Sequence, residues 1–290
     1  MPIQVRGVNQ MAKNKLVSPV VKWVGGKRQL LDEITPLLPR QISTYCEPFL
    51  GGGAVLFARQ PKNAIINDLN GDLMLVYEVI RDDVESLIAA LQEHENTSEH
   101  FYQVRDLDRD KESYKLLSKI EKASRIIYLN KTCYNGLFRV NASGEFNSPF
   151  GHYKKPNIVN EPVLRAVSKY LLSPNIQLFS EDFATTLQRV PRSGFVYLDP
   201  PYDPVSDTAS FTGYNKGGFG RTEQIRLKEC CDALTQRGVK FLLSNSATAF
   251  IRELYAEYTI KTVYAKRAIN SDADKRGAVQ EVLIRNYGAK

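Results

Sequence analysis

The strongest chemical signal in the sequence is a strand that ends in an acid, two prolines and an aromatic ring, at residues 195–202 (FVYLDPPY). Asp199 supplies a hydrogen-bond acceptor where the strand ends, and Pro200 and Pro201 fix the torsion φ and leave their carbonyl groups free to accept. Tyr202 adds a flat ring. Together these groups suit a planar ligand with an exocyclic amine, such as adenine or cytosine. A strand followed by a Pro-Pro turn without chemistry is the alternative.

Two other strands end in residues that could hold a ligand. Residues 45–49 predict a strand that runs into a glycine turn, where Gly51 and Gly53 allow a ligand to lie on the backbone. The next strand ends at Asp68, and its distance from the glycine turn fits the roughly 20-residue spacing of Rossmann folds. We therefore expect Asp68 to accept hydrogen bonds from ribose hydroxyls. The alternative is that Asp68 caps the helix that follows.

Near the N-terminus, residues 22–27 (KWVGGK) place two glycines and a lysine before a short helix. Such a segment could bind phosphate. The G-x-x-x-x-G-K-[ST] spacing of a nucleoside-triphosphate loop is absent, so we do not expect that kind of site.

The segments on either side of the central strand also carry candidate residues. Before it, Asp182 could accept from the adenine amine of a cofactor, and Phe183 could pack on the adenine ring. After it, the polar stretch 203–220 predicts a long loop, and such loops are usually functional lids or disordered. We favour a loop that orders over a base flipped out of a nucleic-acid stack. A basic loop between the last two strands contains Lys266, Arg267, Lys275 and Arg276.

Between residue 71 and about residue 170, apolar residues recur at helical spacing, which predicts a helical insertion between two α/β halves. Within it, residues 137–140, a turn at 141–144 and residues 145–147 predict a β-hairpin. A solvated surface hairpin and a DNA contact both fit this pattern. The surrounding residues are of the types that contact phosphates and base edges: Asn130, Lys131, Asn135, Arg139, Asn141, His152, Lys154 and Lys155.

The composition is that of a globular protein with a basic surface. The chain has 39 Lys plus Arg against 32 Asp plus Glu, a formal charge of +7, which favours a polyanionic partner or serves solubility. No apolar run reaches the length of a membrane span, and residues 1–18 lack the core of a signal peptide, so we expect a cytoplasmic protein without membrane contact. The four cysteines have no C-x-x-C spacing and the three histidines are scattered, so we expect reduced thiols and no metal site.

Three of these motifs stand in the order used by one family. Residues 22–27, 47–53 (EPFLGGG) and 199–202 (DPPY) resemble the motifs of the amino-group DNA methyltransferases, and the adenine-N6 branch most closely; the likeness runs from about Pro19 to Tyr287. The resemblance implies methyl transfer from S-adenosylmethionine to N6 of an adenine flipped out of double-stranded DNA. It implies catalysis by Asp199, Pro200 and Tyr202. It implies cofactor contacts by Trp23, Lys27, Gly51, Gly53, Asp68, Asp182, Phe183 and Asp199.

The stretches 134–141 (YNGLFRVN) and 147–156 (NSPFGHYKKP) are similar to the target-recognition region of GATC-type adenine methylases. The resemblance implies DNA contacts by Lys22, Tyr134, Asn135, Leu137, Arg139, Asn141, Pro149 and Tyr153. Arg139 has the forked group that pairs with a guanine edge, Leu137 and Pro149 offer apolar surface for a thymine methyl, and the family turns the segment of Lys22 toward the first guanine.

Alternating strands and helices predict a Rossmann-like α/β fold whose last two strands form an antiparallel edge pair. We expect a catalytic domain made of residues 1–70, with a mobile tail at 1–17, and residues 171–290, and a target-recognition domain at 71–170. The protein should be a monomer that associates with the nucleoid through DNA, and a cognate restriction endonuclease would act independently.

Two other functions fit part of the pattern. A methyltransferase for RNA or for a protein glutamine amide faces the same planar amine, but Asp199 and the DNA-like hairpin argue against it. A DNA-binding regulator without turnover would be expected to lose Asp199 or the glycine turn, and the sequence keeps both.

Overall fold

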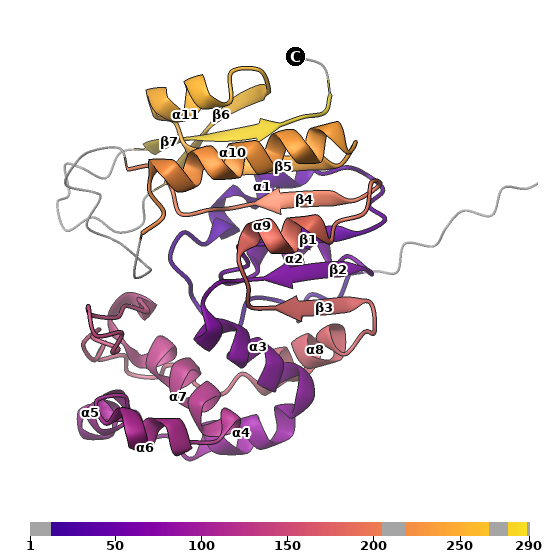
Figure 1. The fold of residues 1–290 in the computed structure, drawn as a ribbon. Coiled ribbons are helices and arrows are strands. Elements are labelled where there is room, and N and C mark those ends of the chain that lie inside the picture. Colours follow the sequence, from indigo (N-terminus) through magenta and orange to yellow (C-terminus); the bar gives the residue numbers. More distant parts are fainter. Residues whose placement is uncertain (1–12, 205–217, 267–277, 289–290) are drawn as a thin grey trace, which may run out of the picture.

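The sheet edge that carries Asp199 is assembled from strands that lie far apart in the sequence. The computed structural model describes residues 13–204, 218–266 and 278–288, and in these ranges the strands form one sheet in the order β3-β2-β1-β4-β5-β7-β6 (Figure 1). The strands are β1 (Tyr45–Glu47), β2 (Ala64–Asn67), β3 (Ile176–Phe179), β4 (Phe195–Leu198), β5 (Lys240–Ser246), β6 (Thr259–Lys266) and β7 (Ala278–Arg285). Strands β1 to β5 pair in parallel, whereas β7 is antiparallel to both β5 and β6. The predicted Rossmann-like sheet with an antiparallel edge pair is thereby confirmed.

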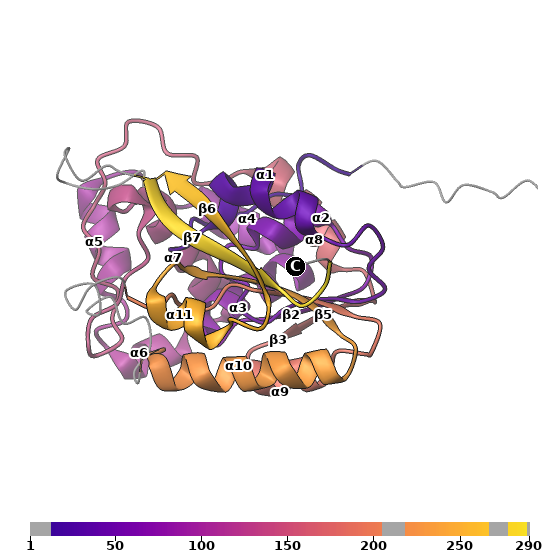
Figure 2. The ribbon, with the colours of Figure 1, turned by 90° about the horizontal axis from the view of Figure 1, so that it is seen from above.

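Both faces of the central strands are covered, because successive side chains of a strand point to opposite faces. Tyr45 and Tyr197 are buried in one apolar cluster with α2, while Cys46 and Val196 are buried in another with α9, α10 and α11. Figure 2 shows α9 and α10 on one side of the sheet and α1 and α2 on the other. These helices are α1 (Leu31–Ile34), α2 (Ala54–Arg59), α9 (Phe183–Gln188), α10 (Arg221–Gln236) and α11 (Ala249–Leu254). Polar side chains that could bind a ligand are therefore expected at the ends of the central strands.

The strand order reverses between β1 and β4. From β1 the sheet extends outward through β2 to β3, and in the other direction β4 lies beside β1 and leads to β5. Ligands of open α/β sheets bind outside the carboxyl ends of the strands at such a reversal. Asp199 follows β4 and the glycine turn follows β1, so two of the predicted motifs meet at this point.

Between β2 and β3 the chain forms helices that lie beyond β3 (Figure 1). They are α3 (Gly71–Asp82), α4 (Val84–Gln92), α5 (Ser98–Asp106), α6 (Lys111–Leu116), α7 (Lys119–Thr132) and α8 (Glu161–Leu171). Their buried residues Leu73, Ile127 and Val167 belong to the same apolar cluster as Tyr45, so this helical part packs directly on the sheet. Its division from the rest at residues 70 and 170 stays a prediction. Within the described ranges, no helix has the length and apolar character needed to cross a membrane.

The predicted hairpin forms as a narrow loop with a single antiparallel bridge between Val140 and Phe146. The Asn141 N–H donates to the Glu145 carbonyl oxygen at 2.8 Å. Asn141 Oδ1 in turn accepts from the N–H groups of Ser143 and Glu145 at 2.9 and 3.0 Å, and its Nδ2 donates to the Glu145 carboxylate. Both ends of the Asn141 amide thus hold the turn together, which is a structural role that the sequence prediction of a DNA contact did not include.

Residues 13–17 correct the predicted mobile tail, because they pack against the end of α2. The Gln60 side chain donates to the Asn14 carbonyl at 2.8 Å and accepts from the Asn14 N–H at 3.1 Å. Residues 205–217, most of the predicted loop over a flipped base, lie outside the described residues. The same holds for residues 267–277, most of the predicted basic loop.

Candidate active site

Acidic side chains stand at the carboxyl edge of four adjacent parallel strands. Glu47 ends β1, Asp68 follows β2, Asp182 follows β3 and Asp199 follows β4. The strand order β3-β2-β1-β4 places them in a row. Glu47 is buried and accepts from the Tyr45 hydroxyl at 2.6 Å, and its burial raises its pKa to about 8. Burial thus favours the protonated form of Glu47.

Asp199 is held by a buried lysine. Lys27 Nζ lies 2.9 Å from Asp199 Oδ1, and the lysine side chain is only 6% exposed. Burial raises the pKa of Asp199 to about 6; the Lys27 ammonium opposes this shift, and the Glu281 carboxylate adds to it. Asp199 is consequently ionised at neutral pH and poised to accept a hydrogen bond.

The same ammonium group lies on the face of Tyr202. Lys27 Nζ is 4.7 Å from the centroid of the Tyr202 ring, a cation–π distance. At the far end of that ring, the Tyr202 hydroxyl donates to Glu281 Oε2 at 2.7 Å. The Lys27 nitrogen thus lies between Asp199 and the face of Tyr202, the groups that the sequence predicts to bind a planar amine; that binding stays a prediction.

The backbone around Tyr202 is fixed on both sides by buried amides. Gln224 Nε2 donates to the Pro201 carbonyl at 2.8 Å, and Asn245 Oδ1 accepts from the Asp203 N–H at 3.1 Å. In the described part of the chain no donor reaches the carbonyl of Pro200. That carbonyl is thus available for the amine of a ligand.

Asp68 ties the glycine turn to the end of β2. Its Oδ2 accepts from the Gly51 N–H and its Oδ1 from the Asn70 N–H, both at 2.9 Å. Burial raises the pKa of Asp68 above its usual value. Helix α3 is capped by Asn70, whose side chain accepts from the Leu73 N–H, so the alternative of Asp68 as the helix cap is wrong. Each Asp68 oxygen has accepting capacity left for ribose hydroxyls.

Trp23 lies between the glycine turn and the hairpin. Gly51 has a φ of +50°, and a Cβ atom there would lie 3.2 Å from Trp23 Cδ1. On its other side the Trp23 ring stacks on Phe138, with centroids 4.9 Å apart and planes at 24°. The segment predicted at the cofactor therefore also supports the hairpin predicted at DNA.

Asp182 and Phe183 share a surface with Arg226 of α10, which the sequence did not single out. Asp182 caps α9 by accepting from the Ala184 N–H at 2.9 Å, and its carboxylate pairs with Arg226. The Arg226 guanidinium lies 4.5 Å above the Phe183 ring, and Phe49 packs beside that ring with centroids 5.3 Å apart. Phe219 packs against both rings, with its centroid 5.7 Å from Phe49 and 5.8 Å from Phe183, and Phe183 is only 5% exposed. A second flat ring would therefore have to displace one of these neighbours.

Asn130 is buried, although its type and position predicted a DNA contact; only 1% of it is exposed. Its Oδ1 accepts from the Lys22 N–H at 2.9 Å, and its Nδ2 donates to the carbonyls of Lys22 at 2.7 Å and Gly136 at 3.3 Å. The amide thus holds the backbone of Lys22 against the turn η3 (Tyr134–Gly136). Two segments predicted to contact DNA are brought together by a residue that is itself inaccessible.

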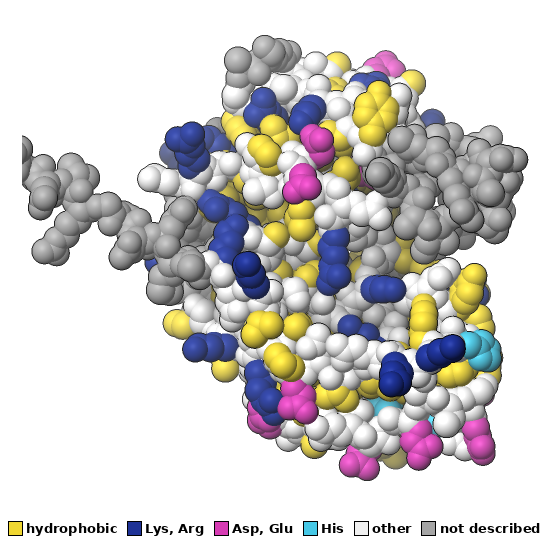
Figure 3. All heavy atoms as spheres, turned by 180° about the vertical axis from the view of Figure 1, so that it is seen from behind, with side chains coloured by type: hydrophobic (Ala, Val, Ile, Leu, Met, Phe, Trp, Pro, Cys, Tyr) yellow, Lys and Arg dark blue, Asp and Glu magenta, His cyan; other side chains and the backbone are white. Residues whose placement is uncertain are grey.

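The remaining predicted DNA residues lie on or near the surface of this region. Arg139 is exposed, and its Nε donates to Asn147 Oδ1 at 2.7 Å. Lys22, Tyr134, Pro149 and Tyr153 are exposed, and Asn135 and Leu137 are partly buried. Figure 3 shows Lys and Arg side chains across the middle of one face, with several Asp and Glu along its lower edge.

Two of the histidines predicted to be scattered lie together. His94 Nδ1 is 2.8 Å from His100 Nε2, and His94 stacks on Tyr128 with centroids 4.2 Å apart. Burial and the neighbouring His100 lower the pKa of His94 to about 4. The pair is part of the helical core, and within the described ranges no three His, Cys, Asp or Glu side chains group as metal ligands.

Sequence reasoning missed Glu281, Gln224 and Arg226. A usable signal existed for Glu281: it stands two residues before Leu283, a core residue, so strand alternation puts the acid on a buried face. Gln224 and Arg226 lie on α10, where polar residues are ordinary, and nothing in the sequence distinguishes them.

Comparison with known proteins agrees with this geometry. The family described as D12 class N6 adenine-specific DNA methyltransferase matches residues 23–269. The type II methyltransferase M.MjaIII of Methanocaldococcus jannaschii is 43% identical over 292 residues, which covers 93% of this chain and 99% of the relative. The type II methyltransferase M1.LlaDCHI of Lactococcus lactis subsp. cremoris is 40% identical over 284 residues, with 97% and 100% covered. The DNA adenine methylase of Escherichia coli K12 is 34% identical over 277 residues, with 94% and 95% covered.

Proposed function

The chain belongs to the D12 class of N6 adenine-specific DNA methyltransferases, and on that premise we propose that it transfers a methyl group from S-adenosylmethionine to N6 of adenine within GATC in double-stranded DNA. The observation that carries the proposal is the position of the Lys27 ammonium, 2.9 Å from Asp199 and 4.7 Å above the Tyr202 ring. A nitrogen donor is thus already placed between the Asp199 acceptor and the ring on which the base would stack.

The residues at the end of β4 address the weak nucleophilicity of the amine, whose lone pair is delocalised into the base. As the methyl carbon leaves sulfur and bonds to N6, the sulfonium becomes a neutral thioether and N6 loses one proton to solvent. Asp199 and the Pro200 carbonyl accept hydrogen bonds from the two N–H groups of the amine and direct its lone pair toward the donor, while Tyr202 stacks on the flipped base. Lys27 makes two of these contacts now, so it has to give them up when the base enters.

The row of acids along β1 to β3 suits the methyl donor. S-adenosylmethionine supplies a methyl group on a positively charged sulfur. Asp68 would accept from its ribose hydroxyls, Gly51 and Gly53 would let it lie on the backbone, and Phe183 would pack on its adenine. The remaining accepting capacity of the buried Asp68 carboxylate supports this fit.

Asp68→Ala should weaken binding of S-adenosylmethionine, because each hydrogen bond to a charged acceptor contributes roughly 1.5–3 kcal/mol. Titration calorimetry measures the affinity directly. Asn70→Ala is the matched control, since it removes the cap of α3 but none of the proposed donor contacts. If Asp68→Ala bound S-adenosylmethionine as tightly as the wild type, the role of Asp68 would be only structural, to hold the glycine turn through the Gly51 N–H.

Arg139→Ala should cost about 1–3 kcal/mol of discrimination at a single guanine, because a bidentate guanine contact is lost. Methylation of GATC is measured against every singly altered site for the wild type and the variant. Lys154→Ala, an exposed lysine of the same region, is the control that should weaken all sites alike and reduce the salt dependence of binding. If Arg139→Ala instead lowered methylation of all sites equally, Arg139 would contact phosphate, as expected of Lys154, and would not read a base.

The reaction and its site are tested together in a host that lacks GATC methylation. DNA from cells that express the protein should resist a GATC nuclease blocked by adenine methylation and be cut by one that requires it. DNA from cells that express Asp199→Ala is the control. Methylation in a different sequence would keep the reaction and overturn GATC, and absence of N6-methyladenine would overturn the reaction.

A further inference from the structure

We propose that Glu281 is a positioning residue for methyl transfer, which fixes the ring of Tyr202 in the orientation that receives the flipped adenine. This proposal rests on the proposed function, in which Tyr202 stacks on the base. Glu281 stands about 80 residues after Tyr202 in the sequence, and the contact arises only because β7 returns beside β5.

The first observation is that the bonds which fix the backbone of Tyr202 do not hold its ring. Gln224 holds the Pro201 carbonyl on one side and Asn245 holds the Asp203 N–H on the other. Neither bond holds the Tyr202 side chain, so the ring is oriented by its own contacts, which are the Lys27 ammonium on its face and a partner at its hydroxyl. The hydrogen bond from the Tyr202 hydroxyl to Glu281 Oε2, at 2.7 Å, restrains rotation of the side chain at the far end of the ring.

The second observation is that Glu281 stands on a rigid support. It pairs with Ser246 of β5 on one side of β7 and with Val263 of β6 on the other, so its backbone is part of the sheet. The following residue, Val282, is fully buried. A side chain on an interior strand is placed more accurately than one on a loop, which is the arrangement that orientation of a reacting group requires.

The third observation concerns the charge. Burial raises the pKa of the Tyr202 hydroxyl well above its usual value, and the Asp199 and Glu281 carboxylates raise it further. The hydroxyl therefore remains a donor throughout the working pH range, and a carboxylate accepts from it more strongly than a neutral oxygen does.

The role predicts a specific pattern among variants. Glu281→Ala should reduce kcat about tenfold, or ~1.4 kcal/mol of barrier, with little change in the KM values of either substrate, because orientation and not binding is lost. Glu281→Gln keeps an oxygen that can accept from Tyr202 and should recover most of the rate. Gln280→Ala, an exposed neighbour on β7, is the matched control and should behave as the wild type.

A double-mutant cycle with Tyr202→Phe decides whether Glu281 acts through the hydroxyl. Tyr202→Phe keeps the ring and removes the donor, so it should lose as much rate as Glu281→Ala, and the double variant should lose no more than either one. Rates are compared about two pH units above the Asp199 pKa of about 6, where the carboxylate stays ionised even if loss of Glu281 shifts that pKa.

The outcomes separate the inference from the proposed function. Losses that add in the double variant, or a Glu281→Ala kcat equal to that of the wild type, would overturn the role of Glu281 while the wild type still methylates adenine. A wild type that transfers no methyl group would overturn the proposed function itself. A kcat loss in Glu281→Ala that Glu281→Gln does not recover, together with a lowered melting temperature in both variants, would also overturn the role and make Glu281 a stability residue.

Discussion

Asp199→Ala should abolish methyl transfer and leave DNA binding largely intact. In the proposed mechanism the acid acts on the flipped base, whereas the surface predicted to hold the duplex is formed by the hairpin region around Arg139. Without the carboxylate the adenine amine loses its charged acceptor, and Lys27, which is 6% exposed, loses its ion-pair partner at 2.9 Å. Single-turnover methylation and DNA-binding titrations measure the two properties separately. A rate above about a tenth of the wild type, or less than ~1.4 kcal/mol of barrier, would contradict the proposed role.

The pH dependence of the methylation rate is a second test of the role of Asp199. The pKa of Asp199 is raised to about 6, and the proposed mechanism requires the carboxylate form to accept from the amine. The rate should therefore be constant above this pKa and fall about tenfold per pH unit below it. Asp199→Asn is the control, because its amide oxygen can still accept but does not titrate. Any residual rate of Asp199→Asn should therefore not fall as the pH is lowered through about 6.

The sequence predicts the central sheet and its motif well because local signals dominate there. The run 195–202 joins four apolar residues to two prolines, which leaves few alternatives for how the strand ends. The antiparallel pairing of β6 with β7 follows from a connection too short for a crossover helix. These features depend on neighbours in the sequence, and the structure confirms them.

The roles of individual polar residues depend on packing that the sequence does not contain. Asn130 and Asn141 have the type expected of DNA contacts, yet one is buried and the other closes the hairpin turn. Asp68 and Asn70 were both able to cap α3, and only the geometry shows that Asn70 does so. Residue type limits what a side chain can do, whereas burial and hydrogen-bond partners decide what it does.

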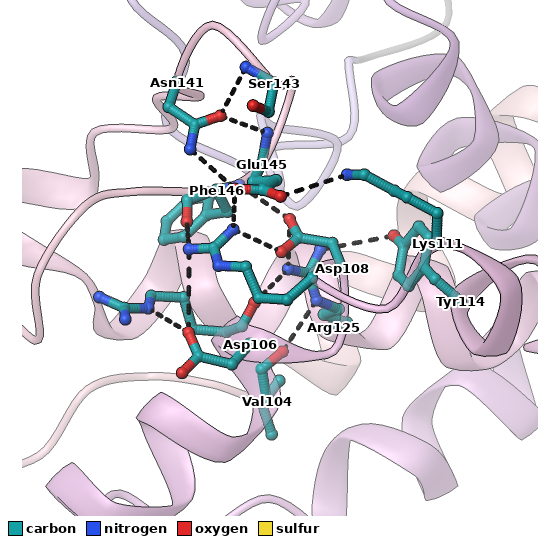
Figure 4. A network of polar contacts seen from close by, with 12 residues as sticks. Val104, Asp106, Asp108, Lys111, Tyr114, Arg125, Asn141, Ser143, Glu145 and Phe146 are labelled. Atoms are coloured by element: carbon teal, nitrogen blue, oxygen red, sulfur yellow. Dashed lines mark hydrogen bonds and ion pairs between the residues drawn. The ribbon is translucent and has the colours of Figure 1, made fainter.

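Arg125→Ala should be strongly destabilising, because it breaks a buried ion pair. Arg125 Nη2 lies 2.8 Å from Asp108 Oδ2, and the two side chains are 5% and 7% exposed. The guanidinium also donates to the carbonyls of Val104 at 2.8 Å and Arg105 at 2.6 Å, in the last turn of α5 (Figure 4). Removal of Arg125 leaves two carbonyls unpaired and leaves Asp108 with Arg109 Nη1, 2.7 Å from its Oδ1, as its remaining ion-pair partner. The loss of stability should therefore be about 3 kcal/mol, the low end for a broken buried pair.

Loss of the Arg125–Asp108 ion pair should also weaken DNA recognition, since Asp108 links the helices to the hairpin. Asp108 Oδ2 accepts from the Phe146 N–H at 2.8 Å, and Phe146 is the residue that bridges to Val140.

Urea unfolding of Arg125→Ala should show the loss of stability. At low temperature, where the variant is folded, its discrimination between GATC and altered sites should fall. Arg165→Ala is the control, because it removes an arginine whose ion pairs with Glu85 and Glu161 are exposed. Its urea concentration at half-unfolding should be close to that of the wild type. The double variant Asp108→Ala/Arg125→Ala should be less unstable than the two single losses added together, because neither Asp108 nor Arg125 is left buried without the other. Simple additivity would mean that the pair does not act as a unit.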